Sequence, residues 1–157
     1  MTNTKETKIV FRQALLNDIP ALHVVRMSVK ENALSNPDLV KPADYEEFLL
    51  RKGRGWLCEV GNEVAGFAIV DIVGNNVWAL FLHPDHERKG IGKRLHADMM
   101  DWYFVQTTAP IWLSTAPGTR AESFYRKAGW TATGFTKSGE VKFEMTADSW
   151  QRRSLCE

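Results

Sequence analysis

The sequence predicts an α/β (α+β) fold over residues 1–157, because strand-like and helix-like segments alternate without a linker, repeat or low-complexity segment. Short apolar runs bounded by turn residues, as on either side of Gly61-Asn62-Glu63, predict strands. Apolar residues at helical spacing predict an amphipathic helix, as at Ile91, Leu95, Met99 and Trp102. With 44% apolar residues, a chain of 157 residues can bury one core, so we expect a single domain.

The N-terminal half is predicted to contain a strand, two helices and a hairpin. Asn17 or Asp18 can cap the first helix, which has Pro20 in its first turn. The second helix ends at Gly53. The expected elements are a strand over 8–13, a helix with Ile19, Leu22, Val25 and Val29 on its buried face, a helix over 43–52, and hairpin strands over 56–60 and 64–72.

The C-terminal half is predicted to contain four more strands and two more helices. Gly74-Asn75-Asn76 turns the chain into the first of these strands, and a basic loop joins that strand to a long helix. The expected elements are a strand over 77–82, a helix from about 91, a strand over 111–115, a helix from 120, and strands over 130–136 and 141–146. The resulting order is β-α-α-β-β-β-α-β-α-β-β.

The loop that leads into the helix at residue 91 predicts a phosphate-binding site. A strand that ends in a basic, glycine-bearing turn presents several backbone N–H groups to one point, and the helix dipole adds partial positive charge there. Gly90 and Gly92 let a ligand approach the backbone without meeting a β-carbon.

Two nucleotide-binding patterns are excluded by the residues of this loop. The Walker A pattern fails because Glu87 stands at its first glycine and Arg94 at its Ser/Thr position. The dinucleotide fingerprint fails because Leu95 stands at its third glycine.

Two blocks instead resemble the GCN5-related N-acetyltransferase (GNAT) superfamily. The loop over 87–92 is similar to the family's acetyl-CoA loop, [QR]-x-x-G-x-[GA], with both glycines in register and Glu87 in the first position. A second block is similar to the family pattern A-x-x-F-Y-x-K-x-G-[FW], and Gly118 stands where that pattern often has asparagine. The second pattern is matched at Ala121, Phe124, Tyr125, Lys127, Gly129 and Trp130.

The resemblance implies a fold and a cofactor. The fold would be a mixed, largely antiparallel sheet of about six to seven strands flanked by helices, forming one N-acetyltransferase domain over 1–157. The co-substrate would be acetyl-CoA, with its pantetheine arm paired to the strand at Leu80, Phe81, Leu82 and His83. Its pyrophosphate would bind the segment Arg88, Lys89, Gly90, Ile91, Gly92, Lys93 and Arg94, with Tyr125 and Lys127 nearby.

The resemblance also implies direct attack of an amine on the thioester, without a covalent acyl-enzyme. Tyr125 is the predicted general acid, because a phenol with a pKa of about 10 can give its proton to a thiolate with a pKa of about 8.5. The general base is left open among Glu31, Asp71 and His83, since the strand over 77–82 has no carboxylate.

The predicted acceptor pocket lies between the first two helices and the strands that face them. Arg26, Glu31 and Asn32 fall on adjacent turns and can present polar groups inward, or can belong to a solvated helix end. Tryptophans in or beside strands can line an aromatic wall for the acceptor, or can belong to the core. They are Trp56, Trp78 and Trp112.

Composition and charge give no indication of a nucleic-acid or membrane partner. Lys and Arg total 20 against 19 Asp and Glu, which gives no reason to expect nucleic acid. No apolar run approaches the length of a membrane span and the N-terminus lacks a signal-peptide core, so we expect a cytoplasmic protein without a membrane partner.

Two further expectations concern metals and assembly. Metal-ligand residue types cluster at His83, Asp85, His86 and Glu87, but stiff Pro84 and the basic residues after them suit an anion, so we expect no metal. The acceptor is a small-molecule or protein amine, and the C-terminal strands can pair two chains as a homodimer. The alternative function is a catalytically inactive acyl-CoA-binding module, which the absent strand carboxylate and Gly118 favour.

Overall fold

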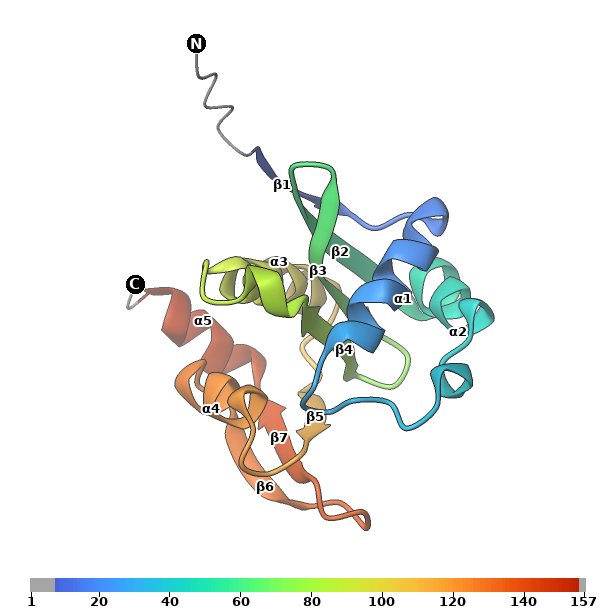
Figure 1. Cartoon of the computed structure of the whole chain (residues 1–157). Helices are drawn as coiled ribbons and strands as arrows, with labels where there is room; N and C mark the ends of the chain where they lie inside the picture. The colour runs from blue at the N-terminus through green and yellow to red at the C-terminus, as the bar shows by residue number, and fades with distance from the viewer. Residues whose placement is uncertain (1–7, 156–157) are drawn as a thin grey trace.

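The computed structural model describes residues 8–155, which form a seven-stranded sheet in the order β1-β2-β3-β4-β5-β7-β6 (Figure 1). All neighbouring strands are antiparallel except β4 and β5, which are parallel. The strands are β1 (Ile9–Gln13), β2 (Gly53–Val60), β3 (Glu63–Asp71), β4 (Asn76–Leu82), β5 (Ile111–Thr115), β6 (Thr131–Phe135) and β7 (Val141–Met145). The helices are α1 (Ile19–Ser28), α2 (Pro42–Glu47), α3 (Ile91–Gln106), α4 (Arg120–Lys127) and α5 (Ala147–Leu155).

The predicted mixed, mostly antiparallel sheet is confirmed, and three details differ from the expectation. The helix expected over 43–52 is α2 followed by a π-helical turn over Phe48–Lys52. Val29, expected on the buried face of the first helix, has extended backbone and ends α1 instead. Helix α5 was not predicted, although Thr146 marks its start by accepting the Ser149 N–H through its hydroxyl at 3.1 Å.

Asp18 stands at the start of α1 but does not cap it with its side chain. Its carboxylate accepts the Leu15 N–H at 2.8 Å and both terminal nitrogens of Arg12 at 2.8 Å. Arg12 also donates to Glu59 of β2. Asp18 therefore ties the entry to α1 onto the sheet.

The sheet is covered on both faces by helices, and each face has its own core (Figure 1). Helices α1 and α2 cover one face, where Leu22 and Tyr45 pack on Phe67 and Ile69. Helices α3, α4 and α5 cover the other face with a larger core. This core includes Leu95, Met99, Met100, Tyr103, Tyr125, Trp130, Phe143 and Trp150.

Strands β4 and β5 meet only near their beginnings. The single paired position is Asn76 with Trp112, and no later residue of β4 pairs with β5. A bulge lies just beyond this paired position: Ile69 faces Ala79 and Val70 faces Val77, so Trp78 is an extra residue in β4. The second half of β4 therefore has an edge that β5 does not cover.

Candidate active site

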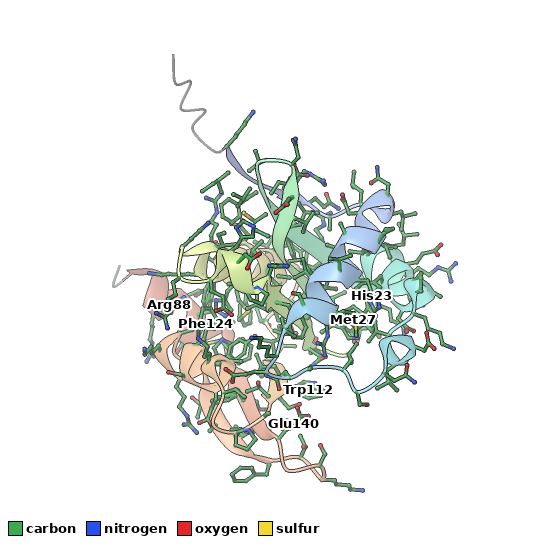
Figure 2. All side chains as sticks on the ribbon, viewed as in Figure 1. His23, Met27, Arg88, Trp112, Phe124 and Glu140 are labelled. Atoms are coloured by element: carbon green, nitrogen blue, oxygen red, sulfur yellow. The ribbon has the colours of Figure 1, made fainter. Side chains whose placement is uncertain are left out.

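A cleft of about 690 Å³ lies where β4 and β5 separate. One wall is β4 and the loop that follows it, another is α4, and the segment after α1 closes the end (Figure 2). Figure 2 labels Arg88, from the loop after β4, and Phe124, from α4, which both line this cleft. The full lining is Val29, Lys30, Glu31, Asn32, Leu80, Phe81, Leu82, Pro84, Glu87, Arg88, Gly92, Arg120, Ala121, Ser123, Phe124, Tyr125 and Lys127.

The loop before α3 has the backbone that a phosphate site needs. Arg88 and Gly90 have φ values of 64° and 77°, in the left-handed region, and Gly90 is the N-cap of α3. A β-carbon at Gly90 would meet nothing within 4 Å, so glycine is needed there for its backbone conformation. At Gly92 a β-carbon would lie 3.3 Å from the Leu82 side chain, so that glycine also permits close packing of α3 on β4.

The predicted cofactor residues divide into two groups. Those that line the cleft are Leu80, Phe81, Leu82, Arg88, Gly92, Tyr125 and Lys127. The others, His83, Lys89, Gly90, Ile91, Lys93 and Arg94, are not part of the lining. Among these, Ile91 is buried in the core and Arg94 pairs with Asp98 at 3.1 Å.

The uncovered edge of β4 offers main-chain groups to the cleft. His83 donates its N–H to Ala65 of β3 at 2.8 Å. Because alternate residues of a strand point their N–H and C=O groups to opposite edges, Leu80 and Leu82 direct theirs away from β3, toward the cleft. An extended pantetheine arm could pair there as an added strand.

Tyr125 lies at the base of the cleft and is only 6% exposed. Its ring is held by Phe124, Trp130 and Phe143, with ring centroids 5.3, 5.6 and 6.2 Å away. Burial raises the pKa of its phenol well above the usual value. The hydroxyl therefore keeps its proton at neutral pH, as a general acid must.

His96 of α3 lies beneath Tyr125 and was not predicted to be part of the site. Its ring centroid is 6.2 Å from that of Tyr125, and its Nε2 accepts the indole N–H of Trp130 at 2.9 Å. Burial lowers the pKa of His96 to about 3, so the imidazole is neutral. Its helical spacing from Met99 and Tyr103 was the available sequence signal for a buried position.

The three candidate bases lie in different places. Glu31 lines the cleft and accepts the backbone N–H of Arg120 at 3.1 Å, at the first turn of α4. His83 is outside the lining, and its Nδ1 accepts the Asp85 N–H at 3.1 Å. Asp71 is the last residue of β3 and faces the start of β4, at the end away from the glycine loop. Its carboxylate accepts two N–H groups of the β3–β4 turn. Of the three, the structure brings only Glu31 to the cleft.

The predicted acceptor residues also separate into two places. Asn32 lines the cleft with Glu31 and joins it to β5, because its side chain donates to the Thr115 hydroxyl and accepts the Ala116 N–H, both at 3.0 Å. Arg26 and Trp78 instead lie on the α1–α2 side of β4.

Arg26 is the one described residue with a buried side-chain nitrogen or oxygen that lacks a hydrogen-bond partner, at Nη1. Its guanidinium carbon lies 4.0 Å above the Phe81 ring, and burial lowers the pKa of the group. Tyr45 is near Arg26 and meets Trp78 edge to face, with ring centroids 5.3 Å apart.

The other two tryptophans of the proposed aromatic wall are occupied elsewhere. Trp56 contacts Trp102 of α3, on the opposite face from Trp78, with ring centroids 5.7 Å apart. Trp112 donates its indole N–H to the Gly74 carbonyl at 3.1 Å. Only Trp78 lies beside Arg26, so the three do not form one wall.

An ion pair that the sequence did not suggest connects two walls of the cleft. Glu87, from the loop after β4, pairs with Arg120 at the start of α4. Among residues 8–155, no group of three His, Cys, Asp or Glu is placed to hold a metal ion, and no helix is long and apolar enough to cross a membrane.

The acetyltransferase (GNAT) family model matches residues 22–130, which is more than half of the chain. The chain belongs to the GNAT family. The match includes β4, the glycine loop before α3, and α4, which line the cleft, and it also includes β5. Membership in this family makes the chain an acetyltransferase by class. A comparison with curated protein sequences finds no significant match.

Solved structures of other GNAT proteins have the same fold. PaiA N-acetyltransferase from Thermoplasma acidophilum, solved with coenzyme A, is 16% identical, with a TM-score of 0.75 over 88% of this chain and 99% of that one. Ribosomal-protein-alanine N-acetyltransferase from Brucella melitensis is 18% identical, with a TM-score of 0.70 over 87% and 99%. A Bacillus anthracis acetyltransferase, solved with acetyl coenzyme A, is 18% identical, with a TM-score of 0.68 over 88% and 99%.

Proposed function

We propose that this GNAT protein transfers the acetyl group of acetyl-CoA directly to a primary amine of a small molecule or protein. The observation that carries the proposal is the cleft between β4 and β5. It combines an uncovered strand edge, a glycine loop at a helix N-terminus and a buried phenol. These three features suit a pantetheine arm, a diphosphate and a departing thiolate.

The cleft is also charged appropriately for an anionic co-substrate. Lys30, Arg88, Arg120 and Lys127 line it, against two carboxylates, Glu31 and Glu87. Two solved relatives in fold contain coenzyme A or acetyl coenzyme A, which supports the same ligand here.

The reaction we propose forms the C–N bond of an amide and breaks the C–S bond of the thioester. The amine nitrogen attacks the thioester carbonyl carbon and gives up a proton to the base, the C–S bond breaks, and the sulfur takes the proton of the Tyr125 hydroxyl. The base then releases its proton to solvent and the Tyr125 phenolate takes one back, so each turnover restores both groups. The dry surroundings that raise the pKa of Tyr125 also raise the proton affinity of a thiolate formed beside it. Glu31 is the candidate base for the amine proton, because it is the one proposed base that lines the cleft.

The test has two parts. Acetyl-CoA consumption is measured over a panel of amines by detecting the released thiol, and acetyl-CoA binding is measured by calorimetric titration. We expect saturable acetyl-CoA binding and turnover with at least one amine. Binding without turnover of any amine would favour an inactive acyl-CoA-binding module. Absence of binding would overturn both functions.

A further inference from the structure

The ion pair between Glu87 and Arg120 joins two segments that form opposite walls of the cleft. Glu87 follows β4, whereas Arg120 is the first residue of α4, so their ion pair links the two walls through oppositely charged side chains. The backbone N–H of Arg120 is fixed separately by Glu31, at 3.1 Å. Both side chains remain partly exposed, 37% for Glu87 and 51% for Arg120.

Glu87 alone would disfavour a phosphate ligand. It stands at the start of the glycine loop, only one residue before Arg88, so a free carboxylate there would repel an anion bound to the loop. Pairing with Arg120 cancels that charge locally. The planar guanidinium donates paired N–H hydrogen bonds to carboxylate or to phosphate oxygens with the same geometry. Arg120 can therefore replace a carboxylate partner by a phosphate without leaving the cleft.

We propose that Arg120 is a binding residue for the diphosphate of the coenzyme and that Glu87 positions it at the cleft until the ligand arrives. When the diphosphate binds, the Arg120 guanidinium donates hydrogen bonds to phosphate oxygens, either in place of the Glu87 carboxylate or in addition to it. Arg120 thus supplies, from α4, positive charge to a loop whose first position is acidic. This inference rests on the proposed function, because it requires a CoA-type ligand in this cleft.

The experiment compares two ligands by calorimetric titration: coenzyme A, which has the diphosphate, and pantetheine, which has no phosphate. The proteins are the unaltered chain, Arg120→Ala, Glu87→Gln, and the double variant. Arg126→Ala is the matched control, because Arg126 lies on the same helix and pairs with Glu122 at 2.9 Å but does not line the cleft.

We expect Arg120→Ala to weaken coenzyme A binding by about tenfold to a hundredfold, the usual effect of losing a charge-assisted hydrogen bond. Glu87→Gln should bind coenzyme A at least as tightly as the unaltered chain. The double variant should recover part of the loss, because it leaves no unpaired carboxylate beside the loop. Pantetheine affinity and the Arg126→Ala control should not change.

Two results would overturn the inference alone: equal coenzyme A affinity of Arg120→Ala and the unaltered chain, or an equal loss for coenzyme A and pantetheine. The second result would assign Arg120 a structural role. If the unaltered chain binds no coenzyme A, the proposed function fails as well, so the two failures are distinguishable.

Discussion

The cleft side of the molecule and the α1–α2 side of β4 differ in how their charged groups are satisfied. On the cleft side, Glu87 pairs with Arg120 and Glu31 accepts the Arg120 N–H at the start of α4. On the other side, Arg26 is stacked on Phe81 with a buried nitrogen that lacks a partner. The cleft is therefore electrostatically organised without a ligand, whereas Arg26 retains an unused donor.

This difference separates the part of the site whose charged groups are already paired by the fold from the part that keeps a hydrogen-bond donor without a partner. A buried hydrogen-bond donor without a partner costs free energy, so the place where the fold leaves one calls for an explanation. The cleft between β4 and β5 shares Tyr125 with the core, and Ile91 at the start of α3 is buried in the same core. The α1–α2 side instead carries Arg26, whose buried Nη1 has no hydrogen-bond partner. Four changes test this division.

The largest expected effect is that of Tyr125→Phe on turnover. Loss of a general acid should lower kcat by about 10²- to 10⁴-fold, while acetyl-CoA affinity stays the same because the buried ring is retained. The measurement is steady-state kinetics beside calorimetric titration. Tyr45→Phe is the matched control: Tyr45 is also buried, at 1% exposure, but lies on the α1–α2 side, where its hydroxyl forms a hydrogen bond with His23. A similar kcat for Tyr125→Phe and the unaltered enzyme would remove Tyr125 from the mechanism.

The second effect is acid sensitivity of the core beneath Tyr125. The pKa of His96 is lowered to about 3 in the folded protein, so its stabilising contribution is complete above the unfolded value of 6.5 and is lost as pH falls toward 3. Between pH 7 and pH 5 the free energy of unfolding should fall by about 2 kcal/mol from this group. Urea denaturation at both pH values measures it. His96→Gln should show a correspondingly smaller fall, and an equal fall in both proteins would contradict the assignment.

The glycine loop before α3 and the elements on either side of it could be predicted because their signals are local. The glycines at 90 and 92, the strand before them and the helix after them lie within one continuous segment. The pattern around Tyr125 is equally compact. Turn residues, hydrophobic periodicity and motif spacing all depend on residues that are close together in the sequence, so the sequence alone can predict them.

The remaining features depend on contacts between distant residues. Glu87 and Arg120 are 33 positions apart, and Asn32 reaches Thr115 across 83 positions. Nothing in the sequence around Asn32 distinguishes a side chain that joins β5 from one at a solvated helix end, since its partners are fixed only by the packing of α1 against the sheet. Helix α5 differs from the prediction for another reason: the sequence predicts a strand through Thr146, whereas β7 ends at Met145 and the Thr146 hydroxyl accepts the Ser149 N–H at the start of α5.

The third effect concerns Asn32, which links the segment after α1 to the end of β5. Asn32→Ala removes two hydrogen bonds, to Thr115 and Ala116, and places alanine at a φ of 56° that suits asparagine better. We expect the free energy of unfolding to fall by about 1–2 kcal/mol. Asn32→Asp keeps the acceptor for the Ala116 N–H and should lose less. Denaturant titration checks both, and a larger loss for the aspartate variant would contradict this account of the contact.

The smallest expected effect on stability is that of Arg26→Met, which also gives the sharpest test of the comparison. Replacing a partly buried guanidinium, whose buried Nη1 lacks a hydrogen-bond partner, by an apolar side chain of similar length should change the free energy of unfolding by less than about 1 kcal/mol, and toward greater stability. Arg12→Met is the contrasting control, because Arg12 is paired with Asp18 and Glu59 and its loss leaves two carboxylates without their cation.

If Arg26 binds the acceptor, the same variant should raise the acceptor KM by about tenfold or more, the usual cost of losing a hydrogen bond from a charged group. The KM for acetyl-CoA should stay constant, because Arg26 does not line the cofactor cleft. A marked loss of stability with unchanged acceptor KM would show that Arg26 is a structural residue. The unpaired donor would then reflect packing on Phe81 rather than recognition of a substrate.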